Sequence, residues 1–173
     1  MSENSSTWQV LTYLQKCKEE ILGFDYRVQY SPDGRPIFVM LMTPAMRTNS
    51  LQYSHILFLD CQKRQMNKIA WTYMGPSVLN SENRVAVCCE AIVTAEDIDT
   101  YTWVIQSMLD IEPRWSLACI DIIFADCFIT YKLLINLGII DTCCLHGDYY
   151  HLFREVWPKP ENFGRLFTLI ENP

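Results

Sequence analysis

Apolar residues repeat along the first third of the chain with two periods, and each period predicts a kind of element. Apolar side chains recur every three or four residues from Trp8 to Leu22, which is typical of a helix with one buried face. Two extended runs then flank the turn signal Ser31-Pro32-Asp33-Gly34, and so they predict a hairpin. The elements predicted up to residue 54 are a helix over 8–22, strands over 24–30 and 36–42, and a short helix over 46–53.

The central part of the chain contains apolar runs that are typical of strands buried on both faces. His55 to Asp60 is one such run and Leu117 to Asp121 is another, and an acid ends each of them. Gly138 is a usual stop for a helix that precedes it. The elements predicted here are strands over 55–60, 69–74 and 84–93, a helix over 98–109, a strand over 117–121, a helix over 127–137, a strand over 141–145 and a helix over 148–156.

This β-β-β-α-β-α-β-α order predicts an α/β fold, in which helices cover both faces of a mixed sheet. The predicted organisation is an N-terminal lead-in over 1–54, made of a helix, a hairpin and a short helix, a core over 55–157, and a C-terminal tail over 158–173. Periodicity alone leaves other doubly wound folds open.

The composition is that of an ordinary globular domain, and it narrows the classes of function. The chain has 173 residues, which suits one domain, and a formal net charge of −6. DNA-binding domains usually have a basic face, and no run of Lys or Arg is present. The best basic cluster, over 63–68, is expected to be a solvated loop. The acidic balance therefore argues against tight autonomous binding of duplex DNA.

The cysteines and the apolar stretches indicate where the protein resides. Several of the eight cysteines lie inside apolar runs, as buried free thiols often do. No secretory signal is visible at the N-terminus, so we expect reduced cysteines and an intracellular protein. The most apolar stretch, over 127–140, is interrupted by Lys132 and Asn136 and is too short to span a bilayer, so we expect no membrane contact.

Asp60 and Asp121 are the candidate catalytic and metal-binding residues. Neighbouring strands lie about 4.8 Å apart, so acids at equivalent ends of two parallel neighbours could share a cation. Oxygen ligands suit Mg²⁺ or Mn²⁺, which support phosphodiester chemistry. The alternative for each residue is an exposed loop acid or a helix N-cap, the role that we expect for Asp126 and Asp148.

Short motifs follow one another over roughly three quarters of the chain: Phe24-Asp-Tyr-Arg-Val28, Pro32-Asp-Gly34, the strand through Phe38 and Met42, Leu57-Phe-Leu-Asp60, Asp99-Thr-Tyr-Thr-Trp103, Ala118-Cys-Ile-Asp121 and Cys143-Cys-Leu-His146. This ordered set resembles the transposase domain of Mutator-like elements, which has a ribonuclease H-like core. The resemblance implies that the first and fourth core strands are parallel neighbours and that Asp60 and Asp121 are the first two catalytic aspartates. It also implies metal-dependent cleavage and transfer of DNA strands, with DNA as the partner, in the nucleus.

The chain also departs from that family. Gln62 stands where the family usually has a Thr two residues after the first Asp. The family's third carboxylate, a Glu, follows well beyond the Cys-x-x-His motif, and Glu155 and Glu161 lie too close to that motif to replace it. Cys143 and His146 match the motif, but zinc needs four ligands and no second pair follows, so we expect no bound zinc.

Three hypotheses about function remain. The first is a transposase-derived nuclease core, which the missing third carboxylate predicts to be inactive as this chain alone. The second is a non-enzymatic remnant that acts in protein or DNA interaction, as in the plant far-red-response transcription factors that resemble this family. The third is an unrelated doubly wound binding domain, which would be excluded if Asp60 and Asp121 were adjacent.

Overall fold

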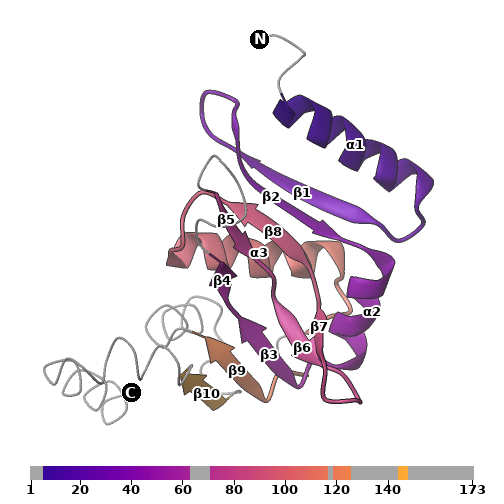
Figure 1. Ribbon diagram of the computed structural model, residues 1–173, viewed down its shortest axis with the longest axis vertical. Helices are drawn as coiled ribbons and strands as arrows, with labels where there is room; N and C mark the ends of the chain where they lie inside the picture. Colours follow the sequence, from indigo (N-terminus) through magenta and orange to yellow (C-terminus); the bar gives the residue numbers. More distant parts are fainter. Residues whose placement is uncertain (1–5, 63–70, 117–118, 126–143, 148–173) are drawn as a thin grey trace, which may run out of the picture.

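The described part of the chain is a mixed α/β fold with two five-stranded sheets (Figure 1). A computed structural model describes residues 6–62, 71–116, 119–125 and 144–147. We call the first sheet, β1-β2-β8-β5-β4, the hairpin sheet; its pairs are antiparallel. We call the second, β10-β9-β3-β6-β7, the mixed sheet, because β10, β9 and β3 are parallel neighbours and the other pairs are antiparallel. The elements are α1 (Ser6–Glu20), β1 (Asp25–Tyr30), β2 (Pro36–Met42), α2 (Pro44–Gln52), β3 (Ile56–Leu59), β4 (Cys61–Gln62), β5 (Thr72–Met74), β6 (Ser77–Leu79), β7 (Val85–Val87), β8 (Glu90–Val93), α3 (Ile98–Ile111), β9 (Ile122–Ala125) and β10 (Cys144–Gly147).

Three segments of the chain pass from one sheet into the other. β3 continues into β4 after Asp60, β5 into β6 across residues 75–76, and β7 into β8 across residues 88–89. The last two segments face each other there. Between the pairs Met74–Ala91 and Ser77–Val87, two residues of one segment lie opposite three of the other, and such an extra residue bends a strand at a β-bulge. The single mixed sheet predicted from the sequence is therefore divided into two, because its three meander strands bend at the same level.

The predicted hairpin is confirmed and belongs to the main body of the protein. β1 pairs antiparallel with β2, and Gly34 in the turn has a φ of 79°, a conformation that glycine adopts at little cost. β2 also pairs with β8, so the hairpin extends the meander. Met40 and Met42 are fully buried in the same core as Leu57. The predicted lead-in thus shares a sheet and a hydrophobic core with residues that follow position 54.

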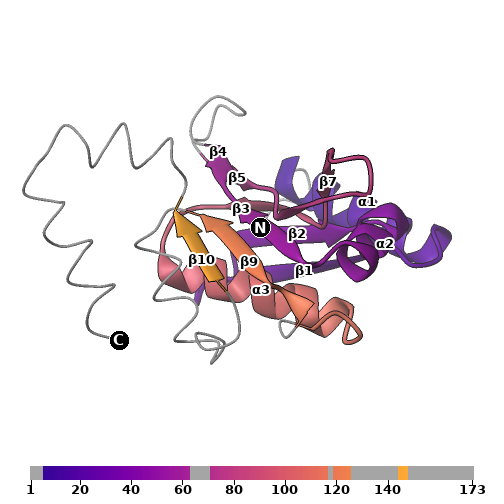
Figure 2. The ribbon, with the colours of Figure 1, turned by 90° about the horizontal axis from the view of Figure 1, so that it is seen from below.

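Helices α1 and α3 cover opposite faces of the hairpin sheet (Figure 2). Successive strand residues point to opposite faces. Accordingly, Val39 and Leu41 pack with α1, whereas Met40 and Met42 belong to the main core that α3 completes. The rings of Trp103 on α3 and Phe38 on β2 lie 5.3 Å apart. The three helices predicted before residue 112 are therefore confirmed, and α1 and α3 each bury one face.

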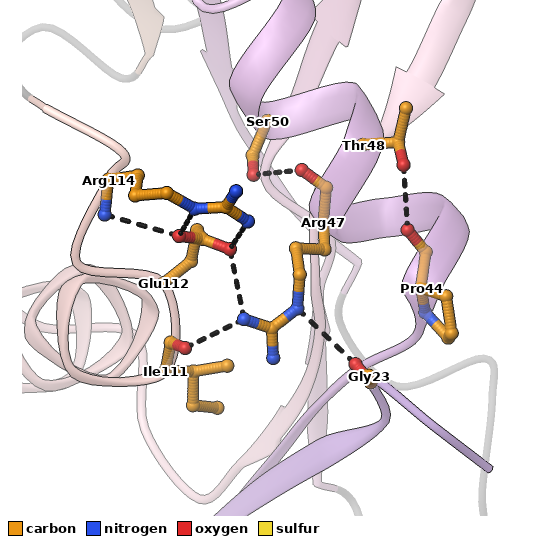
Figure 3. Close-up of polar contacts among 8 residues, drawn as sticks. All are labelled: Gly23, Pro44, Arg47, Thr48, Ser50, Ile111, Glu112 and Arg114. Atoms are coloured by element: carbon orange, nitrogen blue, oxygen red, sulfur yellow. Dashed lines mark hydrogen bonds and ion pairs between the residues drawn. The ribbon is translucent and has the colours of Figure 1, made fainter.

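A buried carboxylate ties α2 to the end of α3 (Figure 3). Glu112, with a side chain only 2% exposed, accepts hydrogen bonds from Arg114 Nε at 2.7 Å and from Arg47 Nη1 at 2.9 Å. Arg47 also donates to the carbonyls of Ile111 and Gly23. The hydrogen bonds from Arg114 outweigh the opposing effect of burial and, with those from Arg47, lower the pKa of Glu112 to about 2. We call these three charged residues the Glu112 clamp.

Several predicted features lie outside the described residues. The predicted strand over 141–145 overlaps β10. The predictions that lie outside the described residues are the basic cluster over 63–68, the helices over 127–137 and 148–156, the tail over 158–173, and the roles given to Asp126, Cys143, Asp148, Glu155 and Glu161.

Candidate functional site

The fourth core strand lies later in the sequence than predicted. It is β9, Ile122–Ala125, and Asp121 precedes it, so the prediction that Asp121 ends a strand is wrong. The apolar run continues on both sides of Asp121, and tertiary pairing selects the second half. Ile123 is 2% exposed, and the ring of Phe124 stacks on that of Phe58 at 5.1 Å.

The structure does not bring Asp60 and Asp121 together. β3 and β9 are parallel neighbours, as predicted for the first and fourth core strands, with Ile56 opposite Ile122. Asp60 follows the carboxyl end of β3, whereas Asp121 lies before the amino end of β9 and is aligned with His55. Five residue-to-residue steps along β3 separate the two levels, which is about 16 Å at about 3.3 Å per step. A cation shared directly by these two carboxylates is therefore not compatible with this register.

Asp121 has a different partner at its own end of the sheet. Its Oδ2 lies 3.1 Å from Nδ1 of His55, and its backbone N–H donates to the His55 carbonyl at 2.9 Å. Both side chains are more than 70% exposed. Exposed pairs of this kind contribute about 0–1 kcal/mol to the free energy of unfolding, so this pair adds little to the stability of the fold.

Asp60 lies in a chain of polar contacts that runs from the surface into the core. Its Oδ1 accepts the backbone N–H of Cys61 at 2.8 Å. The Sγ atom of Cys61 lies 3.3 Å from the hydroxyl of Tyr101, which in turn donates to Glu96 Oε1 at 3.5 Å. Asp60 itself is exposed, whereas Tyr101 is 2% exposed. The carboxyl end of β3 is thereby connected to the first turns of α3.

The electrostatic character of this edge is acidic. Burial is the largest cause of a strongly raised pKa for Tyr101, and the contact with Cys61 and the carboxylates of Glu96 and Asp60 raise that pKa further. These groups disfavour a second negative charge at the phenol, and for the same reason they favour a cation nearby. Sequence reasoning named Asp60 as a candidate and did not name the other three residues, because only tertiary packing brings α3 to the end of β3.

Ligand sets for a metal ion are incomplete within the described residues. No three His, Cys, Asp or Glu side chains there come together in a way that could hold a metal ion. His146 lies on β10, opposite Phe124 on β9, and Cys143 lies outside the described residues. The prediction that this Cys-x-x-His pair binds no zinc stays a prediction.

The described cysteines form no disulfide with one another. Cys88 and Cys89 are fully buried at the bend between β7 and β8. Burial raises the pKa of Cys88 to about 12 and raises that of Cys89 well above its ordinary value. Reactivity of cysteine requires the thiolate, so these two thiols are packing residues.

Over the part of the chain that the structure describes, no helix is both long and apolar enough to cross a membrane. Searches against protein-family models, curated proteins and solved structures found no match for the chain.

Proposed function

We propose that the chain is a ribonuclease H-like domain related to the transposases of Mutator-like elements, and that its metal-binding edge is the carboxyl end of β3. The observation that carries the proposal is the strand order of the mixed sheet. Three antiparallel strands, β3, β6 and β7, are followed in the sequence by β9 and β10, which add in parallel on the other side of β3. The pairing of β3 with β9 meets the expectation that the first and fourth core strands are parallel neighbours.

The position of Asp60 supports the choice of edge. β3, β9 and β10 run in the same direction, so their carboxyl ends meet at one edge of the sheet. In open sheets with parallel strands, ligands bind beyond those ends, where the strand order reverses. β3 is the strand at which an antiparallel partner on one side gives way to a parallel partner on the other. Asp60 is the residue that follows it.

The chemistry of this edge fits a divalent cation in part. Asp60 offers an exposed carboxylate in acidic surroundings, and Mg²⁺ binds through one or two carboxylates while it keeps several waters. The described residues supply no group of three His, Cys, Asp or Glu side chains that could hold the ion. The next residue in the sequence after β9 is Asp126, which lies outside them. When bound, such an ion would stabilise negative charge on a phosphodiester.

The first prediction concerns this ion and uses Mn²⁺ as the probe. We expect Mn²⁺ to broaden the NMR signals of residues around Asp60, and Asp60→Asn to weaken that binding by about tenfold or more, since it removes a direct ligand. Asp121→Asn is the matched control, because it makes the same change at the opposite end of the paired strands, and it should leave the response unchanged. Equal loss in both variants, or no loss in Asp60→Asn, would refute the proposed edge. Asp126→Asn tests whether the ion has a ligand beyond β9.

The second prediction is that this chain alone neither nicks nor joins DNA. Phosphodiester transfer by two metal ions needs carboxylates that fix both ions, and the third carboxylate implied by the resemblance has no counterpart in the sequence. The net charge of −6 also limits the gain in affinity from counterion release. The measurement is incubation of the chain with a labelled duplex and Mn²⁺, followed by a denaturing gel. Cleavage that disappears in Asp60→Ala would show instead that the chain is a self-sufficient nuclease.

A further inference from the structure

We propose that Tyr101 is a positioning residue that holds the carboxylate of Asp60 in one orientation by acting through Cys61. As a statement about metal binding, this inference rests on the proposed function of Asp60. Its geometric part stands on the contacts between the three residues alone.

The first link is a fixed phenol in contact with a thiol. Tyr101 is 2% exposed and lies in the main core, where α3 packs against the sheets, so its ring has no room to move. Its hydroxyl donates to Glu96 Oε1 at 3.5 Å, which leaves the phenol oxygen to accept from the thiol of Cys61 at 3.3 Å. The side chain of Cys61 is therefore tied to a rigid group on α3.

The second link runs from Cys61 to the carboxylate. Cys61 begins β4, a strand of two residues at the edge of the hairpin sheet, so the contact of its side chain with Tyr101 adds to its pairing with Met74 in holding the backbone at this point. Its N–H donates to Asp60 Oδ1 at 2.8 Å. An exposed Asp would otherwise exchange among staggered rotamers, and the hydrogen bond selects one of them. Groups that lock the orientation of a ligand in this way raise its affinity for the metal.

The variants for the test are Tyr101→Phe, Cys61→Ala and Cys61→Ser in the full chain. Tyr101→Phe keeps the buried ring and removes only the hydroxyl, and Cys61→Ser keeps a donor for the phenol that Cys61→Ala removes. The matched control is Tyr73→Phe. Tyr73 lies on neighbouring β5, and the change removes the hydrogen bond of 3.4 Å from its phenol to the carboxylate of Glu90. The readouts are the rotamer populations of Asp60 from three-bond NMR couplings, hydrogen exchange of the Cys61 amide, and Mn²⁺ affinity, each measured well below the unfolding midpoint of the variant.

We expect one dominant Asp60 rotamer in the wild type and in Cys61→Ser, and several rotamers with faster Cys61 amide exchange in Tyr101→Phe and Cys61→Ala. Mn²⁺ should bind about three- to tenfold more weakly in the last two variants, the effect of one lost hydrogen bond. Tyr73→Phe should match the wild type in all three readouts.

The readouts separate this inference from the proposed function. A single Asp60 rotamer in Tyr101→Phe would overturn the inference whether or not the metal binds. So would an unchanged Mn²⁺ affinity when binding depends on Asp60, or an equal loss in Tyr73→Phe. If Asp60 loses its fixed rotamer in Tyr101→Phe while wild-type Mn²⁺ binding is independent of Asp60, the orienting role stands and the proposed metal edge fails.

Discussion

Replacing Glu112 with alanine is expected to destabilise the protein by about 3–5 kcal/mol, the usual result of removing one partner from a buried ion pair. The side chain of Arg47 is 22% exposed and would lose its carboxylate partner, although it keeps its bonds to two backbone carbonyls. Arg114 is 72% exposed and can regain water, so it adds little to the loss. Urea unfolding at pH 7 measures the change.

The same residue gives the protein a defined acid sensitivity. The pKa of Glu112 falls from 4.5 in the unfolded chain to about 2 in the folded protein, so the unfolded state binds the proton more readily. The contribution to stability is therefore complete above pH 4.5 and is lost as the pH falls through 2. A shift of this size corresponds to about 3 kcal/mol, at about 1.4 kcal/mol for each pKa unit.

Glu112→Gln isolates this contribution. Other carboxylates make the wild type acid-sensitive as well, so the quantity to compare is the difference between wild type and variant as the pH falls from 5 to 2. That difference should shrink toward zero. Glu82→Gln is the matched control, because Glu82 pairs with Arg84 on the surface and both side chains are more than 60% exposed. It should change stability by less than about 1 kcal/mol at any pH. A wild-type pH profile that is unchanged in Glu112→Gln would contradict the role of the clamp.

A chain that begins at residue 55 is expected not to fold cooperatively, although position 54 is the predicted domain boundary. Removing the lead-in deletes the strand that pairs with β8 and the fully buried side chains of Met40 and Met42. It also deletes Arg47, which leaves Glu112 without its partly buried partner. Losing one buried Met side chain costs about 2–5 kcal/mol, and a whole domain has only about 5–15 kcal/mol of stability.

The control is a chain that begins at residue 24. It lacks α1, which packs through Leu11, Leu14 and Cys17 on the far face of the hairpin sheet, but it keeps the main core and the clamp. We expect a cooperative unfolding transition with a lower midpoint in urea, followed by circular dichroism. A cooperative transition in the chain that begins at residue 55, with a midpoint similar to that of the longer chain, would show that the predicted boundary separates two folding units.

The local signals in the sequence were sufficient for the elements that are fixed by short-range chemistry. Helical spacing predicted α1, and the Ser31-Pro32-Asp33-Gly34 turn predicted the hairpin, because both depend on residues near in sequence. The helix predicted over 98–109 is α3, whose N-cap, Asp97, accepts the N–H of Thr100 at 2.9 Å. The choice of Asp60 as a residue that follows a buried strand was also correct.

What the tertiary structure decided is which apolar residues pair across the chain and which polar groups meet. The run on either side of Asp121 could supply a strand before or after that residue, and only packing against β3 placed β9 at Ile122–Ala125. This one choice moved Asp121 to the opposite edge from Asp60. The hydrogen bond between Arg47 and Glu112 likewise joins residues 65 positions apart, and the contact of Cys61 with Tyr101 joins residues 40 positions apart. Periodicity describes the face of an element, but a side-chain contact between distant elements is fixed only when the whole core is packed.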